Sequence, residues 1–510
     1  MESPRSTSAS PSRRRVLTGV IAGAGLLGAG WAASGRILAE ATAPDPVRSV
    51  TAAFTSADQR SALTEAQARS LPQDSRVLPA LSGLDPELRQ REFLLVSSPW
   101  IESLPARHRS LAVSALLDLW VLTDSLPATV ASWSTHWRYV WPRDAAFVAV
   151  ALGRVGHVAA AWNHLLHLQS LQGADGSFAA RYLTEGNRTP DDRASQFDSV
   201  GLVVWAVSEV HAAARAQERD LERAQERDLD QMTPTDELRA DVQAGADDQM
   251  RVGEKIHPSD RNPIGPQVSG EPIVLEAMAP LLVRSSDILT VRTAAGTRLP
   301  PPSSDYWEVV ESRVTLGIAA PTLVGLHHLA ELASRRPDLA KSLPGGAQAA
   351  VGAAQAFRGT FDRMFTATGL QRYPTTGGLD SAVAYLPATG VDVGIDAAVL
   401  DGVWKTLEQP AGGIRPGEGW HFDRASWTPS TSLMGLAYAR VGARAQAEGI
   451  LDWLSRHRTS AGSLPEKIAG DGSGASVAPL SWTAANVILS LDELYRPRDS
   501  VPPGMGPGDG

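Results

Sequence analysis

The stretch WRYVWPRDAAF, residues 137–147, places four aromatic rings, two arginines and an aspartate where a helix is predicted to begin. A helix that only buries one face needs apolar residues at spacings of three and four, not this many polar groups. Flat rings with paired donors and acceptors suit a sugar, which has an apolar face and a rim of hydroxyl groups. The stretch therefore indicates one wall of a sugar pocket. The simpler interpretation is an Arg143–Asp144 pair that caps the helix.

Helices are predicted over most of the chain from Arg109 onward, because apolar residues recur at spacings of three and four. The eleven predicted helices are 110–122, 143–155, 157–172, 196–216, 271–293, 313–334, 345–365, 393–408, 430–441, 443–458 and 479–495. A twelfth is considered at 85–92, and strand signals are sparse. Tight and long connections alternate, which favours an all-α closed toroid of helical hairpins. The long loops then share one end, where a site is expected.

The N-terminal segment, residues 1–43, has the pattern of an export signal. The basic stretch SRRRVL (12–17) precedes an apolar run to Ala33, and its adjacent arginines are typical of a twin-arginine signal. Cleavage after Ala39 or Ala43 would give a secreted protein. An uncleaved run could just span a bilayer, with attachment to the outer face of the cytoplasmic membrane through residues 16–33. The alternative is an ordinary signal or anchor helix.

Composition divides the rest of the chain. Residues 44–108 are predicted to be a linker and N-terminal arm, 109–496 the helical domain and 497–510 a flexible tail. Within the domain, residues 215–260 are densely charged, which indicates a solvated helix extension followed by a disordered insertion; partner binding is the alternative. The net charge of -9 over 510 residues disfavours nucleic-acid binding. The absence of cysteine excludes disulfides and thiolate metal sites.

Two glutamates are candidates for acid–base chemistry, because each lies in a loop that precedes a long predicted helix. Glu308 follows the aromatic pair at 306–307, and apolar rings favour the protonated carboxyl group that a general acid requires. Glu466 precedes Lys467, whose charge would help to keep a general base ionised. The simpler interpretations are a carboxylate at a helix N-terminus for Glu308 and an exposed loop acid for Glu466. Glu311 is the rival of Glu308.

Three blocks occur in the order WRYVWPRDAAF (137–147), SDYWE (304–308) and LPEK followed by PLSW (464–482). Together they resemble the glucoamylase-like family of inverting α-glucosidic hydrolases, glycoside hydrolase family 15. The resemblance covers residues 110–495. It implies an (α/α)6 barrel with its site at the loop-rich end, an α-linked oligo- or polysaccharide substrate, and no cofactor. It also implies inversion, for which the two carboxyl groups stand ~6.5–9.5 Å apart with a water between them.

The resemblance also assigns roles to residues of this sequence. Glu308 matches the general acid and Glu466 the general base. The residues expected to bind the substrate are Trp141, Arg143, Asp144, Gln196, Asp198, Tyr306, Trp307, Arg415 and Trp427. Arg143 and Asp144 match the pair that hydrogen-bonds the hydroxyl groups of the terminal glucose, and Trp141 matches an aromatic residue of the same subsite.

The chain departs from the family pattern at two places. Lys467 stands where glutamine usually follows the base, and Pro416 stands where tyrosine follows the arginine within GGIRPGEGWHFDRASWTPST (412–431). Both changes fall in the substrate subsites, so trehalose, isomaltose-type and other α-glucosides stay open, as does a sugar other than glucose. The N-terminal β-sandwich that is common in bacterial members is not expected, because too few residues precede Ser110.

Two other functions are weighed. A non-catalytic carbohydrate-binding protein of the cell envelope could use the same barrel and would bind sugar without hydrolysing it. A toroid lyase would need a histidine or tyrosine base in a cationic cleft, and the sequence offers no clear set. No metal site is expected, because the paired histidines (164 and 167, 327 and 328) do not give three converging ligands.

Overall fold

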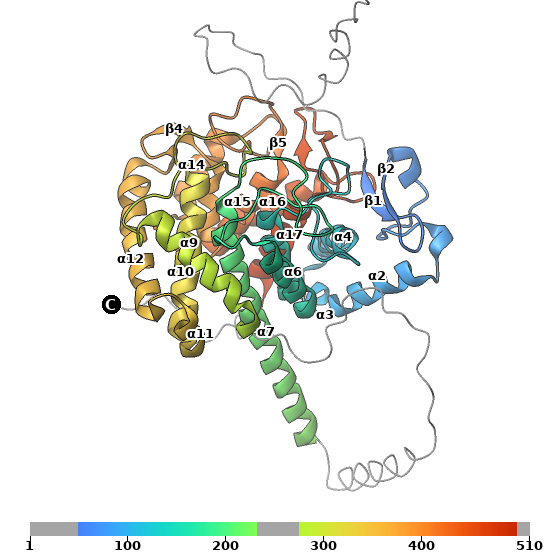
Figure 1. Ribbon diagram of the computed structural model, residues 1–510. Coiled ribbons are helices and arrows are strands. Elements are labelled where there is room, and N and C mark those ends of the chain that lie inside the picture. The colour runs from blue at the N-terminus through green and yellow to red at the C-terminus, as the bar shows by residue number, and fades with distance from the viewer. Residues whose placement is uncertain (1–48, 232–274, 497–510) are drawn as a thin grey trace, which may run out of the picture. The chain divides into compact units, whose positions relative to one another are not determined.

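The computed structural model describes residues 49–231 and 275–496, which all belong to one compact unit (Figure 1). These residues are mostly helical with a few very short strands, so the predicted all-α class is confirmed. The predicted export segment, the part of the charged insertion after Gln231 and the predicted tail from residue 497 onward lie outside the described residues.

Twelve helical elements build the main body within the described residues. They are α4 (Ala106–Thr123), α5 (Pro142–Arg154), α6 (Val158–Leu171), α7 (Asp198–Gln231), α9 (Ala279–Thr293), α10 (Leu316–Arg335), α12 (Gly346–Met364), α13 (Tyr385–Ala388), α14 (Ala397–Leu407), α15 (Thr428–Arg440), α16 (Arg444–Arg456) and α17 (Ser481–Tyr495). The other helical elements are α1 (Glu65–Ala68), η1 (Pro79–Leu81), α2 (Asp85–Val96), α3 (Ser98–Ser103), η2 (Leu275–Met278), α11 (Pro337–Ser342), η3 (Thr366–Thr368) and η4 (Ser381–Ala384).

The body has an inner ring and an outer layer of helices. In the inner ring α5, α7, α10, the η4–α13 segment, α15 and α17 each pack against the next, and α17 closes the ring on α5. The outer helices α4, α6, α9, α12, α14 and α16 pack against this ring, and the chain alternates between the two layers. Inner helices such as α5 and α15 are buried on nearly every side. This arrangement is consistent with the predicted six-hairpin barrel.

The inner helices run in the same direction. Near their N-termini, the hydroxyl groups of Thr428 on α15 and Thr483 on α17 are 2.8 Å apart. Near their C-termini, Arg440 of α15 pairs with Glu493 of α17 at 3.1 Å. The N-termini of the ring therefore meet at one end, where the positive ends of the helix macrodipoles favour carboxylates and other anionic groups.

Two inner helices cross closely because each has a glycine at the crossing. A Cβ atom on Gly201 of α7 would lie only 1.8 Å from the carbonyl oxygen of Pro321 on α10. A Cβ atom on Gly325 of α10 would lie 2.6 Å from the Cα atom of Gly201. The backbones can approach this far only without side chains, and the contact sets the spacing between the loops that enter α7 and α10.

The twelfth predicted helix is not a member of the ring. The stretch 85–92 does form a helix, α2, but it packs on the outside of α4. The remaining ring member is instead the segment 381–388, which joins a 3-10 turn to a single α turn and contains Pro387. Eight residues are too few to display a helical period, and proline argues against a helix interior, so the pattern gave no signal.

Part of the segment predicted to be a linker is folded. Strands β1 (Thr51–Phe54) and β2 (Arg60–Leu63) form an antiparallel hairpin in which Thr51 lies opposite Leu63. Phe54 is buried with its ring centroid 5.1 Å from that of Trp120 on α4. The short strand is half alanine, a weak strand former, and this explains why it was missed. Residues 49–81 are called the N-terminal arm below.

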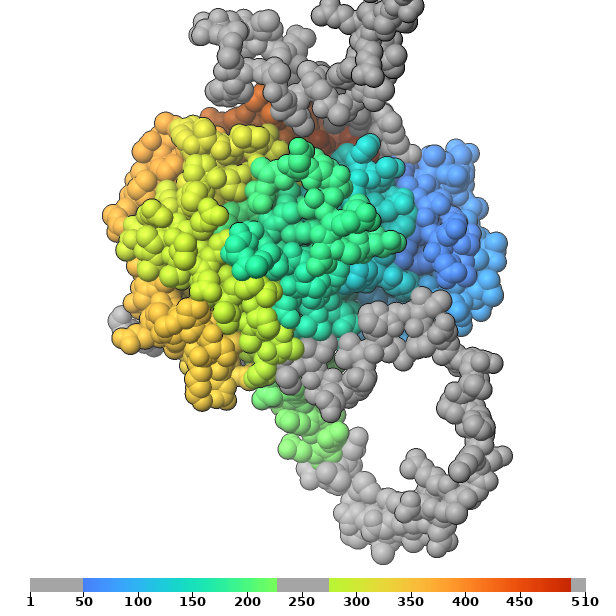
Figure 2. Space-filling model, in the orientation of Figure 1, coloured from blue at the N-terminus to red at the C-terminus, as the bar shows by residue number. Residues whose placement is uncertain are grey.

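Helix α7 is 34 residues long and continues past the neighbouring helices as a charged, mostly exposed rod (green in Figures 1 and 2). The helix therefore extends into the charged stretch as far as Gln231. In the described part of the chain, α10 alone is long and apolar enough to cross a bilayer, and most of it is buried in the body.

Candidate active site

The stretch 137–141 leads directly into α5 after a turn through Trp137 and a bend at Tyr139. Val140 exchanges two backbone hydrogen bonds of 2.9 Å with Tyr182, and Trp141 caps the helix ahead of Pro142. Trp137, Tyr139 and Trp141 pack with Val477 and Leu480 in one apolar cluster.

The two candidate carboxylates both bind to this stretch. Trp141 Nε1 donates a hydrogen bond of 2.7 Å to Glu308 Oε1, and Trp137 Nε1 donates one of 3.3 Å to Glu466 Oε1. The donors are four residues apart in the chain, so both carboxyl groups are held by the stretch 137–141. The two glutamates were predicted to share a site; their catalytic roles stay a prediction.

Glu308 lies in a strained turn well before α10, which begins at Leu316, so the helix-capping interpretation does not apply. Its φ of 58° is left-handed, and its backbone N–H donates to the carbonyl of Asp305 at 2.8 Å. Such a conformation in a non-glycine residue costs ~1–3 kcal/mol and is typical of functional sites. The second oxygen of the Glu308 carboxylate is paired with Arg193.

Glu466 is nearly buried, so the interpretation as an exposed loop acid is wrong. Its backbone N–H donates to the carbonyl of Val477 at 2.8 Å, and its own carbonyl accepts from the N–H of Thr428 at 2.9 Å. Ser476 donates its hydroxyl to Glu466 Oε2, while Trp137 holds Oε1. Both carboxylate oxygens are thus oriented by a donor.

Lys467, which was predicted to act on Glu466, is paired with a different carboxylate. It lies on strand β6 (Lys467–Ile468), pairs with Asp423 at 3.0 Å and places its ammonium group 3.9 Å from the ring centroid of Trp427. Consecutive side chains point in opposite directions along extended backbone, which explains why neighbours in sequence separate here. Trp427 also donates to Asp423 at 3.1 Å, so one of its faces and its N–H are already engaged.

The aromatic pair before Glu308 also behaves differently from the prediction. The ring of Trp307 is covered by the guanidinium group of Arg372, 3.5 Å from its centroid, so that face is not free for a sugar. The hydroxyl group of Tyr306 donates to Asp380 and to the carbonyl of Pro416. The indole that contacts the carboxylate of Glu308 is that of Trp141.

Arg372 also binds Glu311, the alternative candidate for the general acid. Its guanidinium group pairs with Glu311 at 2.6 Å, and Tyr373 donates its hydroxyl to the same carboxylate at 2.8 Å. Glu311 is thus held in a buried network with Asp305 and Asp380, which the same guanidinium group binds. Its engagement there leaves Glu308 as the glutamate that faces the Trp137–Trp141 wall.

Arg143 joins most of the remaining predicted residues. Its Nη1 atom donates to Gln196 at 2.9 Å and to Asp198 at 3.1 Å. Its Nη2 atom lies 3.3 Å from Asp144 and 3.9 Å from Glu308 Oε1. Residues from the starts of α5 and α7 and from the loop before α10 therefore converge, as the sequence predicted.

Burial changes the proton affinity of the two aspartates at this point. Removal from water raises the pKa of Asp144 to about 6, although the adjacent Arg143 opposes the shift. Asp198 behaves in the same way, and its pKa is also raised to about 6. Both groups are ionised at neutral pH and become protonated in mildly acidic solution.

Buried polar atoms without a partner gather around Arg143. Within the described residues, Gln196 Nε2, Tyr385 Oη and Trp482 Nε1 have no hydrogen-bond partner. The Trp482 ring lies 5.1 Å from the guanidinium group of Arg143 and is stacked on Tyr385. Buried donors and acceptors normally find partners, so their concentration here indicates a surface built for a polar ligand.

Several of these residues were not predicted from the sequence. Trp137 and Trp482 stand inside the quoted blocks but received no role, and Arg193 and Ser476 carry no sequence signal that marks them. Arg415 was predicted in the subsite; in the described part of the chain, no hydrogen bond or ion pair of its side chain joins it to the other predicted residues, and its Nε atom is buried without a partner.

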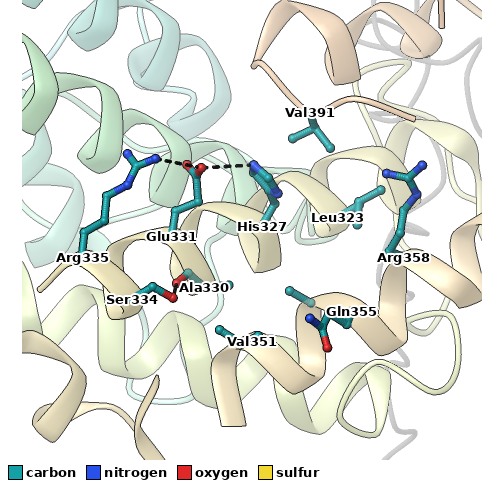
Figure 3. Close-up of a pocket in the computed structure, with 11 residues that line it drawn as sticks. Leu323, His327, Ala330, Glu331, Ser334, Arg335, Val351, Gln355, Arg358 and Val391 are labelled. Atoms are coloured by element: carbon teal, nitrogen blue, oxygen red, sulfur yellow. Dashed lines mark hydrogen bonds and ion pairs between the residues drawn. The ribbon is translucent and has the colours of Figure 1, made fainter. Parts of the chain in front are cut away.

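A separate cavity of about 530 Å³ lies between α10 and α12 (Figure 3). Figure 3 shows Glu331 between Arg335 and His327 on one side, with Arg358 across from them. None of the predicted site residues lines this cavity. Its charged groups are already paired with one another or with neighbouring residues, as Arg358 is with Asp362, so the cavity has no chemistry in common with the carboxylate pair.

The fold is that of glycosidases and glucoamylases, which confirms at the level of the fold the resemblance predicted from sequence. Several solved structures named glycosidase, one in complex with glucose, superpose with a TM-score of 0.54 at 18% identity, covering 81% of this chain and 99% of theirs. A bacterial glucoamylase complexed with acarbose gives a TM-score of 0.52 at 15% identity over 78% of this chain and 57% of that one. The glucoamylase from Saccharomycopsis fibuligera gives 0.51 at 12% identity over 75% and 94%.

Sequence comparison is more limited. No family model matches the chain. A curated relative, an uncharacterized glycosyl hydrolase from Methanocaldococcus jannaschii, is 33% identical over 104 residues. The matched region is 20% of this chain and spans only 16% of the relative's length.

Proposed function

We propose that this chain is a glycoside hydrolase that cleaves α-glucosidic or related α-glycosidic bonds by a single inverting displacement. The observation that carries the proposal is the pair of carboxylates, Glu308 and Glu466, held by indole N–H groups of the stretch 137–141. Arg143, Asp144 and their partners lie beside Glu308, where a terminal sugar would be gripped. The glycosidase and glucoamylase fold supports the same reaction class.

In the proposed reaction Glu308 donates a proton to the glycosidic oxygen as the bond to the anomeric carbon breaks. Glu466 accepts a proton from a water molecule, whose oxygen attacks the opposite face of that carbon. Each turnover thus consumes one water and leaves the two carboxyl groups with exchanged protons. Arg143 donates to a sugar hydroxyl group and Asp144 accepts from one, which fixes the ring between the two glutamates.

Arg193 imposes one further requirement on this reaction. Its guanidinium group is paired with the carboxylate oxygen of Glu308 that Trp141 does not hold. A general acid has to reach the oxygen atom that it protonates, so this pair has to open when substrate enters.

The test is a screen of the purified protein against trehalose, maltose, isomaltose and longer α-linked oligosaccharides, with the product anomer followed by NMR. We expect hydrolysis of at least one substrate with release of the β-anomer first. Glu308→Gln and Glu466→Gln should each lower kcat by more than about 10³-fold while the circular dichroism spectrum is unchanged. Glu331→Gln, in the separate cavity, is the matched control and should retain full activity.

The alternative is a carbohydrate-binding protein on the same fold. Sugar binding that survives both glutamine substitutions, together with no hydrolysis across the whole panel, would replace the hydrolase proposal with this one. Release of the α-anomer first would instead keep the hydrolase and reject inversion.

We also propose that the protein acts outside the cytoplasm, either released or attached to the outer face of the membrane. The support is the SRRRVL stretch and the apolar run to Ala33.

A further inference from the structure

The segment that carries Glu466 is tied to helix α4 by one buried carboxylate. Ser463 donates its hydroxyl to Asp118 Oδ1 at 2.6 Å, and the backbone N–H of Leu464 donates to Asp118 Oδ2 at 2.8 Å. Asp118, Ser463 and Leu464 have no exposed surface. Asp118 therefore uses both oxygens to hold residues that lie two and three positions before Glu466.

The same carboxylate is anchored in turn by the N-terminal arm. Arg76 pairs with Asp118 at 2.9 Å, and both side chains are almost completely buried. The backbone N–H of Arg76 donates to Gln90 Oε1 on α2 at 2.7 Å, which fixes the arginine itself. A buried ion pair with further hydrogen bonds has a well-defined geometry, because each partner left alone would be strongly destabilising.

The hairpin of the arm reaches the same segment directly. The hydroxyl groups of Thr51 on β1 and Ser463 are 2.7 Å apart, and Thr459 donates its hydroxyl to the carbonyl of Val50. Ser460 donates to Glu65 on α1 at 2.6 Å. In Figure 1 the hairpin lies next to α4, which agrees with their direct packing. Residues 459–464 are thus held along their length by the first part of the described chain.

On its other side Glu466 is held by the barrel itself, through Val477 and Thr428. Residue 464 is two positions from Glu466, at most about 7 Å of extended chain, so a shift of residue 464 would also displace the carboxylate of Glu466. A displacement of about 1 Å at a catalytic group costs up to ~10²-fold in rate. This tether, formed by the hydrogen bonds of Asp118 to Ser463 and Leu464, is therefore close enough to Glu466 to affect the reaction. It does not touch the carboxylate of Glu466 or the residues proposed to bind the sugar.

We propose that Asp118 is a positioning residue for Glu466, and that the N-terminal arm sets the reactivity of this base through the Arg76–Asp118 pair and Thr51. The inference rests on the proposed function, in which Glu466 is the general base. It gives the N-terminal arm, part of a segment predicted to be a linker, an indirect role in hydrolysis.

Ser463→Ala is the decisive variant, because it removes one bond to Asp118 while Arg76 and Leu464 still satisfy the carboxylate. With the α-linked disaccharide that the wild type cleaves fastest, we expect kcat to fall about 10-fold and KM to stay within about twofold. Hydrogen exchange of residues 464–468, followed by mass spectrometry, should become faster. Ser490→Ala on α17 removes an equally buried hydroxyl bond of 2.7 Å far from Glu466, and should change neither quantity.

A second pair of variants separates positioning from stability. Thr51→Val keeps the shape and loses the hydroxyl group, and should reproduce the kcat loss of Ser463→Ala in weaker form. Thr51→Ser loses a buried methyl group and keeps the hydroxyl, so it should lower the melting temperature but leave kcat unchanged. The proposal would be overturned if kcat in these variants changed with the melting temperature and not with the presence of the hydroxyl group.

The experiments can reject the positioning role of Asp118 without rejecting the proposed function. Wild-type hydrolysis that is abolished by Glu466→Gln but unaffected by Ser463→Ala would reject the positioning role alone. A wild type that cleaves no α-linked probe would reject the proposed function, and the catalytic part of this inference with it. Unchanged exchange of residues 464–468 in Ser463→Ala would reject the tether whatever the activity.

Discussion

At the scale of single residues, each of the two candidate carboxylates accepts a hydrogen bond from an indole N–H group. Trp141 holds Glu308 at 2.7 Å and Trp137 holds Glu466 at 3.3 Å. An indole donates one hydrogen bond in a fixed direction and carries no net charge. The two tryptophans therefore orient one oxygen of each carboxylate without adding charge, whereas Arg193 pairs with the other oxygen of Glu308.

Trp141→Phe tests this role at Glu308. The ring stays and the donor is lost, and a hydrogen bond to a charged group contributes ~1.5–3 kcal/mol. We expect kcat/KM on an α-linked disaccharide to fall about 10- to 100-fold, measured under initial-rate conditions. Trp100→Phe is the control, because the N–H of Trp100 has no partner within the described residues. An unchanged kcat/KM in Trp141→Phe would argue against orientation of the acid by this indole.

The raised pKa of Asp144 predicts a pH dependence of sugar binding. Its pKa is about 6, raised by burial, so the carboxylate accepts from a hydroxyl group only above this pH. Affinity should therefore be full near pH 7.5 and be lost as pH falls through about 6. Calorimetric titration of the Glu308→Gln variant with glucose between pH 4.5 and 8 measures this without turnover. Addition of Asp144→Asn to this variant should weaken glucose binding and reduce its dependence on pH. Equal plots of affinity against pH with and without Asp144→Asn would reject Asp144 as the group that accepts from the sugar hydroxyl.

At the scale of helices, the inner ring is locked at the end away from the site by buried charges. Glu209 of α7 pairs with Arg154 of α5 and lies 3.8 Å from Arg440 of α15. Burial alone would raise the pKa of Glu209, but the two arginines outweigh it and lower the pKa to about 2. Three helices of the ring therefore share one carboxylate.

Glu209→Gln should destabilise the protein without touching the site. Leaving Arg154 buried without its partner costs ~3–5 kcal/mol of unfolding free energy. Because the folded-state pKa is depressed, the stabilisation by Glu209 is present above about pH 4.5 and is lost as pH falls toward about 2. The difference in melting temperature between wild type and variant should thus be large at pH 7 and shrink below pH 4.5. Glu222→Gln, on the exposed part of α7, should change neither.

Periodicity predicted the helices well, because most of them bury one side or all sides against neighbours in the barrel. It failed where an element is short: residues 381–388 complete the ring with eight residues, and β1 has only four. The predicted part of the site consists of motif residues that contact one another, such as Arg143 and Asp198. Contacts between distant segments could not be predicted. Asp118 and Ser463 are 345 positions apart, and Lys467 turns toward Asp423 because strand geometry, not sequence proximity, decides its neighbours.

At the scale of the whole molecule, the proposed export depends on the arginines at 13–15. A twin-arginine signal reads arginine itself, whereas an ordinary signal needs only positive charge before the apolar run. Replacing all three residues with lysine should therefore retain the protein in the cytoplasm, as measured by cell fractionation and immunoblotting. Arg5→Lys is the matched control and should be exported normally. Normal export of the triple variant would favour an ordinary signal or anchor helix.

The shared direction of the inner helices separates two kinds of position along each of them. Arg143, Asp198 and Trp482 all lie in the first turns of their helices, whereas Arg154 and Arg440 are the last residues of theirs and Glu209 lies beside them, further along α7. Directed evolution can exploit this division. Libraries confined to the opening turns and the loops that precede them would vary substrate preference, while the distal halves keep the scaffold intact and leave room for destabilising changes.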